Sequence, residues 1–155
     1  MQTEEDKKSG RIAGKSMGLD VGEKTIGIAV SDDLGWTAQP LRTLERKAQA
    51  EAIEEILNLA RGLQVDRIVV GLPRNMDGTV GIQGQRVQRF AEMLRSKSEF
   101  AILTWDERLS TVAVERILLQ ADMSRKKRKQ HVDKLAAAYI LQGYLDSLRG
   151  SAKGT

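Results

Sequence analysis

The sequence predicts an α/β fold in which helices pack on a mixed β-sheet. Residues 17–22 and 25–31 alternate apolar with small or polar side chains and are joined at 22–24, which is typical of an antiparallel hairpin. Residues 66–72 form a continuous apolar run, DRIVVGL, as expected of a strand buried on both faces. After a third strand, helical and strand patterns alternate. We therefore expect an antiparallel meander followed by alternating helices and strands.

Three further strands complete the expected sheet. The third, at 37–44, has the weakest pattern, because Pro40 is compatible only with an edge strand or a strand end. The fourth is the apolar run 66–72, and the fifth covers 100–105. Trp105 ends this strand, and we expect both Trp105 and Trp36 to be core residues and not stacking platforms for bases.

Apolar residues at helical spacing predict four helices after the meander. They are expected at 47–61, at 82–96, after a cap at Ser110 or Thr111, and at 131–148. A basic loop is expected at 123–130, between the last two helices.

A chain of 155 residues, 41% hydrophobic and 30% charged, fits one domain. We expect a flexible leader at 1–15, a single folded domain at 16–149 and a flexible tail at 150–155. No apolar run approaches ~18 residues and no secretory signal is present, so a cytoplasmic protein is expected.

Residue types exclude several classes of site. There is no cysteine, which excludes disulfides, thiolate zinc sites and cysteine nucleophiles. His131 is the single histidine, which excludes a histidine metal cage and disfavours a Ser/His/Asp hydrolase.

The net charge of +4 is unevenly distributed along the chain. Residues 1–100 carry 15 basic and 15 acidic side chains, whereas residues 101–155 carry 10 and 6. Five of those ten are consecutive: Arg125, Lys126, Lys127, Arg128 and Lys129. Such a run suits a phosphate backbone, and it is equally compatible with a solvated connection between helices.

Three acids occupy positions that favour chemistry. Asp20 lies inside an apolar strand between Gly18 and Gly22, a floor of small residues that would leave room for a metal ion or a sugar-phosphate backbone. The alternative is an aspartate paired with a nearby lysine such as Lys24. Glu107 follows the fifth strand, at the end of a sheet strand where ligand sites gather, although an acid there also favours the next helix. Asp133 falls in the first turn of the last helix, where it also complements the helix dipole.

Together these acids predict a metal site. Three carboxylates in one place repel one another unless a cation neutralises them. Mg²⁺ and Mn²⁺ prefer oxygen ligands, and two such ions can promote phosphodiester hydrolysis. We expect Asp20, Glu107 and Asp133 to be both the metal ligands and the catalytic residues, with two Mg²⁺ or Mn²⁺ ions.

Further candidates could contact the nucleic acid. Arg74 and Asn75 lie in the GLPRNMDGTVG segment after the fourth strand, Arg108 follows Glu107, and His131 precedes Asp133. Each has an ordinary alternative: turn chemistry for Arg74 and Asn75, pairing with an acidic neighbour for Arg108, and a helix start for His131.

Four segments resemble the YqgF/RuvX family, whose members are called pre-16S rRNA nucleases and Holliday junction resolvases. They are MGLDVGEKTIGIAVSD at 17–32, VVGLPRNMDGTVG at 69–81, DERLST at 106–111 and HVDKLAAAYILQGYLD at 131–146. The resemblance implies a ribonuclease H-like nuclease domain, with a five-stranded mixed sheet whose first three strands are antiparallel. It also implies that Asp20, Glu107 and Asp133 correspond to the family's acidic site residues.

The resemblance also implies processing of the 16S rRNA precursor near its 5′ end, with ribosomal particles as a further partner. Branched DNA is the alternative substrate, and we expect no membrane partner and a monomer or weak homodimer. Two other classes remain open. An actin-like or sugar-kinase ATPase would bind ATP, and a non-catalytic binding module would still bind RNA after loss of the three acids.

Overall fold

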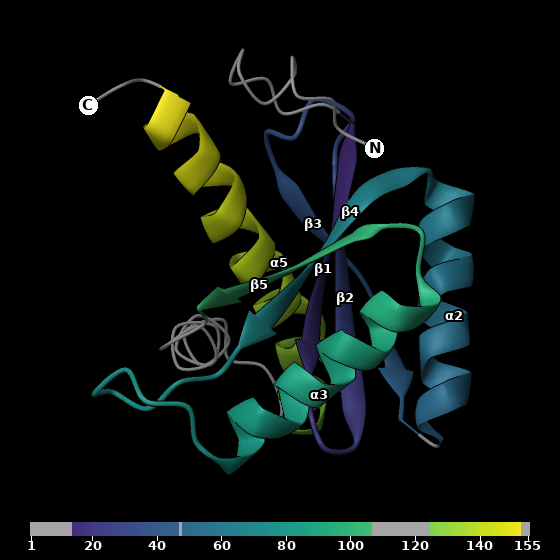
Figure 1. Cartoon of the computed structure of the whole chain (residues 1–155), viewed down its shortest axis with the longest axis vertical. Coiled ribbons are helices and arrows are strands. Elements are labelled where there is room, and N and C mark those ends of the chain that lie inside the picture. The colour runs from purple at the N-terminus through teal and green to yellow at the C-terminus, as the bar shows by residue number, and fades with distance from the viewer. Residues whose placement is uncertain (1–13, 47, 107–124, 153–155) are drawn as a thin grey trace.

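The computed structural model describes residues 14–46, 48–106 and 125–152, and their side chains except those of 125–133 and 150–152. Five strands form one sheet in the order β3-β2-β1-β4-β5 (Figure 1). The strands are β1 (Lys15–Val21), β2 (Thr25–Ser31), β3 (Ala38–Glu45), β4 (Val65–Leu72) and β5 (Ala101–Asp106). The helices are α2 (Gln49–Leu63), α3 (Ile82–Lys97) and α5 (Arg125–Ala152).

The strand directions confirm the expected mixed sheet. The β1–β2 and β2–β3 pairs are antiparallel, and the β1–β4 and β4–β5 pairs are parallel. Pro40 lies in the edge strand β3, where the register with β2 shifts between Ile28 and Ala29. An edge position and a local irregularity are what proline requires in a sheet.

Helices cover both faces of the sheet. Helices α2 and α3 pack on one face, where Phe90 of α3 and Ile56 of α2 meet apolar residues of the strands. Helix α5 packs on the other face (Figure 1). Its Tyr144 meets the ring of Trp105 edge-on, with the ring centroids 5.8 Å apart. Trp105 therefore packs against this second cluster, as expected. The same expectation is wrong for Trp36, which is 55% exposed and stacks under the guanidinium of Arg149 at 4.8 Å. None of the helices in the described part of the chain could cross a membrane.

Helix α5 differs from its expected extent. It begins at Arg125, so the basic run 125–129 is helical and the expected loop at 123–130 is wrong for these residues. Lys and Arg are good helix formers, and the run contains no Gly or Pro that would end a helix. The helix expected after Ser110 or Thr111 lies outside the described residues. Helix α5 also continues to Ala152, past the expected domain end at 149.

Candidate nuclease site

Asp20 faces α5 from the carboxyl end of β1. Side chains alternate along a strand, and Leu19 and Val21 of β1 are buried on the side of α2 and α3. Asp20 is therefore directed to the opposite face, where it is half-buried. Its partner in the antiparallel register is Gly27 of β2, so the residue directly opposite Asp20 has no side chain.

Helix α5 lies directly on β1 at Gly18. A Cβ atom on Gly18 would lie 2.8 Å from the Cβ of Leu141 and 3.0 Å from the carbonyl oxygen of Ala137. The space over Gly18 is thus filled by the helix, so the room expected beside Asp20 does not extend over Gly18. The small residue serves to let the helix approach the sheet.

The direction of α5 places position 133 level with Asp20. Nη1 of Arg149 donates to the carbonyl oxygens of Gly35 and Trp36, at 3.3 and 3.1 Å, beyond the amino end of β1. Earlier residues of α5 therefore lie toward the carboxyl end of β1. Position 133 is one helical turn, ~6 Å, before Ala137, and Asp20 is ~6.6 Å beyond Gly18 on the strand. The side chain of Asp133 is not among those described.

The third acid lies just past the described chain. Because β1, β4 and β5 are parallel, their carboxyl ends share one edge of the sheet, and β5 ends there at Asp106, paired with Leu72. Glu107 and Arg108 follow outside the described residues. Among the side chains that are described, no three His, Cys, Asp or Glu residues gather as metal ligands. The carboxylate of Asp20 is a hard oxygen donor of the kind that Mg²⁺ and Mn²⁺ prefer, so the donor chemistry fits these ions.

Arg74 and Asn75, the two residues of the β4–α3 loop (residues 73–81) predicted to contact nucleic acid, form hydrogen bonds within the loop. Nη1 of Arg74 donates to the carbonyl oxygen of Gly78 at 3.2 Å, and Nδ2 of Asn75 donates to Oγ1 of Thr79 at 3.0 Å. Both side chains are exposed at the same edge as Asp20. The hydrogen bonds of both residues therefore stabilise the turn, as the ordinary alternative predicts, and both side chains remain exposed to solvent. His131 lies in α5, and its side chain is not described.

Asp77 should titrate below the ordinary range of an aspartate. The hydroxyl and the backbone N–H of Thr79 donate to Oδ1 of Asp77, at 2.6 and 3.0 Å, and lower its pKa. A lowered pKa means that these hydrogen bonds stabilise the loop above the unfolded pKa of ~3.9, and that the stabilisation disappears as the pH falls through the lower folded value. In an NMR titration of the carboxyl carbons, Thr79→Val should move the pKa of Asp77 upward. An Asp77 that titrates normally in the unaltered protein would contradict this.

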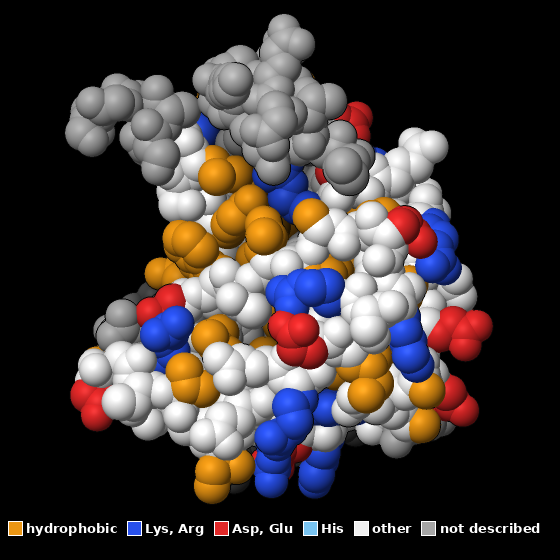
Figure 2. All heavy atoms as spheres, viewed as in Figure 1, with side chains coloured by type: hydrophobic (Ala, Val, Ile, Leu, Met, Phe, Trp, Pro, Cys, Tyr) orange, Lys and Arg blue, Asp and Glu red, His pale blue; other side chains and the backbone are white. Residues whose placement is uncertain are grey.

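The described face around α3 carries mixed charges. Figure 2 shows Lys and Arg side chains interspersed with Asp and Glu over this face. Nη1 of Arg86 on α3 lies 3.2 Å from Oε1 of Glu23, in the turn after β1. This pair places a cation at the edge that carries Asp20. Local sequence patterns do not single out Arg86, because its contact to Glu23 spans 63 residues.

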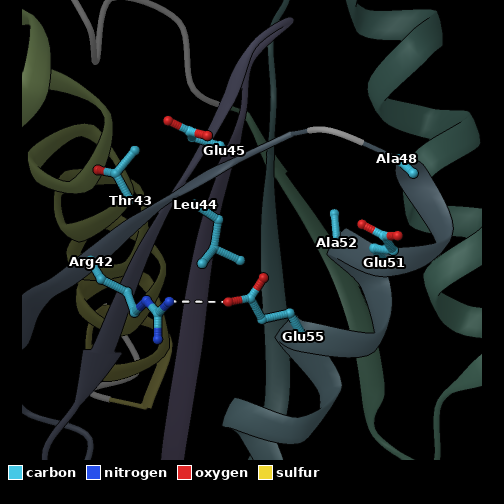
Figure 3. A pocket seen from close by; sticks show the side chains of 8 residues that line it. All are labelled: Arg42, Thr43, Leu44, Glu45, Ala48, Glu51, Ala52 and Glu55. Carbon is cyan, nitrogen blue, oxygen red and sulfur yellow. Dashed lines mark hydrogen bonds and ion pairs between the residues drawn. The ribbon is translucent and has the colours of Figure 1, made fainter.

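A groove of about 310 Å³ lies between β3 and α2 (Figure 3). Its lining includes Glu45, Glu51 and Glu55 against one guanidinium, that of Arg42. Nη2 of Arg42 is paired with Oε1 of Glu55 at 3.0 Å, as the dashed line in Figure 3 marks. Three carboxylates against one cation would repel a phosphate backbone, so the groove does not fit a nucleic acid.

The sheet order and the strand directions are those of the ribonuclease H-like fold, and two solved structures support this fold. The chain superposes on the RuvC of T. thermophilus, in complex with a Holliday junction substrate, with a TM-score of 0.53 and 12% identity over 89% of this chain and 97% of that one. The Fowlpox virus resolvase, also with Holliday junction DNA, gives 0.55 and 11% over 86% and 98%.

The family follows from comparison of the sequences. The model of the family described as "RuvX: Holliday junction resolvase" matches residues 14–147, and the chain belongs to this family. A relative from Bacillus cytotoxicus named "Putative pre-16S rRNA nuclease" is 55% identical over 133 residues, covering 84% of this chain and 97% of its own. One of the same name from Desulforamulus reducens is 56% identical over 131 residues, covering 84% and 96%.

Proposed function

We propose that this chain is a metal-dependent endonuclease that processes the 5′ end of the 16S rRNA precursor in ribosome biogenesis. The observation that carries the proposal is the position of Asp20, half-buried at a strand end and level with position 133 of α5. Relatives at 55 and 56% identity bear the name of a pre-16S rRNA nuclease and support the substrate.

Asp20, Glu107 and Asp133 are the proposed ligands and catalytic residues. Their carboxylates would hold two Mg²⁺ or Mn²⁺ ions, which when bound activate a water and stabilise the leaving oxygen. The close packing of α5 on β1 at Gly18 would hold the backbones of Asp20 and Asp133 near one another. Gly27, directly opposite Asp20 in the antiparallel register, adds no side chain that a scissile phosphate would meet there.

The basic run is the proposed contact to the substrate backbone. Because residues 125–129 are helical, their side chains cannot all face one way. At 100° per residue, Lys126 and Lys129 share the stripe of Asp133, whereas Lys127 and Arg128 fall toward the opposite side of the helix. We therefore expect the first pair to contribute more than the second to binding a strand that enters the site.

We expect the salt dependence of RNA binding to separate these two pairs. Lys126→Gln with Lys129→Gln should weaken binding and reduce the log–log salt slope by roughly one unit for each phosphate that is no longer neutralised. The matched control, Lys127→Gln with Arg128→Gln, removes the same charge and should change the slope little. Filter binding of a precursor 16S fragment over a salt series measures both. Equal slopes for the two double variants would show that the run acts only through its net charge.

Branched DNA is a second candidate substrate, favoured by the description of the family model as a Holliday junction resolvase. The direct comparison offers purified protein a precursor 16S fragment and a four-way DNA junction, each with and without Mn²⁺. Cleavage of the RNA in preference to the junction supports the proposed function. Preferred cleavage of the junction would replace the substrate but keep the site. Binding without cleavage of either would leave a non-catalytic binding module.

A further inference from the structure

The β4–α3 loop begins beside Asp20. Gly18 and Leu19 of β1 pair with Val69 and Val70 of β4, so the next residue of β4, Gly71, is level with Asp20 on the neighbouring strand. Adjacent strands lie ~4.8 Å apart, and five further residues span at most ~17 Å. Met76, at the loop's tip, therefore lies within about 20 Å of the backbone of Asp20. Figure 1 shows the loop projecting from the body of the protein beyond the end of β4.

Hydrogen bonds hold the loop in one conformation. The N–H of Asn75 donates to the carbonyl oxygen of Thr79, and the N–H of Gly78 donates to the carbonyl oxygen of Asn75, both at 2.8 Å. The side chains of Asp77 and Arg74 add their bonds to Thr79 and Gly78. A turn with this many internal bonds loses little conformational entropy when it contacts a substrate.

Tight packing fixes the loop at its base as well. A Cβ atom on Gly84, in the first turn of α3, would lie 2.6 Å from the carbonyl oxygen of Pro73 and 2.5 Å from Cγ1 of Val80. The helix therefore closes onto both ends of the loop. Val80 also packs against the core beneath α3. The loop is an extension of the rigid fold despite its exposed position.

This rigid loop presents an apolar side chain to solvent. Met76 is 71% exposed at the tip, between residues whose polar groups are engaged within the loop. A methionine side chain is flexible and polarisable, and adapts to irregular apolar surfaces. Among the side chains that nucleic-acid-binding proteins insert between base steps are Met, Leu, Ile and Phe.

We propose that Met76 is a wedge that packs between two bases of the substrate strand, within a few nucleotides of the scissile phosphate. The inference rests on the proposed function. Unstacking a base step is cheapest where RNA is already irregular, so the wedge would direct cleavage to such positions and hold the strand in register with Asp20. Met76 is thus a positioning residue that touches bases and takes no part in the chemistry.

The test measures base unstacking and cleavage in the full chain. The probe is a precursor 16S fragment with 2-aminopurine placed in turn at nucleotides near the mapped cut, and its fluorescence rises when the base unstacks. With Asp20→Asn as the background that keeps the RNA intact, binding should raise the fluorescence. Adding Met76→Ala should remove most of that rise, and Met76→Leu should retain it. In the active protein, Met76→Ala should lower kcat/KM about tenfold, comparable to the removal of one base-stacking interaction.

Leu34→Ala is the matched control. Leu34 is an apolar loop residue of similar exposure, 67%, in the β2–β3 connection at the opposite end of the sheet. It should change neither fluorescence nor kcat/KM, and all these variants should melt at the wild-type temperature. If the RNA is cut and Met76→Ala behaves like Leu34→Ala, the wedge is wrong and the proposed function stands. If the wild-type protein neither binds nor cuts the RNA, the proposed function is wrong, and the proposed role of Met76 is wrong as well.

Discussion

Replacing Asp20 with asparagine should abolish metal-dependent cleavage and leave the fold intact. The amide keeps the shape of the side chain but loses the charge that holds a divalent cation. Loss of partners outside a ligand shell already costs ~10–100-fold, so loss of a ligand should lower the cleavage rate by more than ~100-fold. The measurement is the rate at which the variant cleaves a precursor 16S fragment with Mn²⁺. Circular dichroism confirms that the variant is folded.

The matched control for this change is Asp33→Asn. Asp33 lies in the β2–β3 connection, is exposed, and pairs with Lys15 at 3.5 Å. It should retain full activity. Asp133→Asn and Glu107→Gln should resemble Asp20→Asn, and double variants should be little worse than single ones, as for groups that act as one unit. In metal-free buffer the melting temperature of Asp20→Asn should not fall, since one repelling charge is removed. Wild-type cleavage by Asp20→Asn would contradict the site.

Gly18→Val should destabilise the protein and inactivate it. Its Cβ would fall 2.8 Å from the Cβ of Leu141 and 3.0 Å from the carbonyl oxygen of Ala137, and the valine methyl groups need further space. Overpacking of this kind costs ~1–3 kcal/mol of the free energy of unfolding. Helix α5 would move away from β1 and carry position 133 with it, so cleavage should fall more than stability alone explains. Urea unfolding and the cleavage rate measure the two effects.

Gly62→Ala provides the control for a glycine replaced in a regular element. Gly62 lies in α2, and a Cβ atom there would meet nothing within 4 Å. Alanine in a helix should stabilise the protein by about 0.5–1 kcal/mol and leave cleavage unchanged. A Gly18→Val variant with wild-type stability and activity would mean that α5 does not lie against β1.

The local patterns of the sequence predicted the strands and a mixed sheet, whereas the five-stranded arrangement was implied by the family resemblance. Alternation predicted the first hairpin, which the antiparallel β1–β2 register confirms, and Pro40 indicated an edge strand. Both follow from side-chain period and backbone geometry, which act over a few residues. The extent of α5 could not be read in the same way, because a run of five cations suits a helix and a loop equally well.

Contacts between distant segments were beyond the sequence patterns. The glycine at position 18 suggested free space, and only the packing of α5 shows that this space is filled. The pairing of Arg86 with Glu23 and the bracing of the β4–α3 loop likewise depend on residues brought together by the fold. Position 133 could be assigned to the site by resemblance. Its location near Asp20, toward the carboxyl end of β1, follows only from the direction of α5.

The most direct test of the proposed function is to map the 5′ ends of 16S rRNA precursor incubated with the purified protein. With Mn²⁺, the wild-type protein should produce one new 5′ end at the mature terminus or close to it. The same incubation without metal, or with Asp20→Asn, should leave the precursor intact. A precursor that stays uncut by the wild-type protein in Mn²⁺, or one that Asp20→Asn cuts equally well, would contradict the proposal.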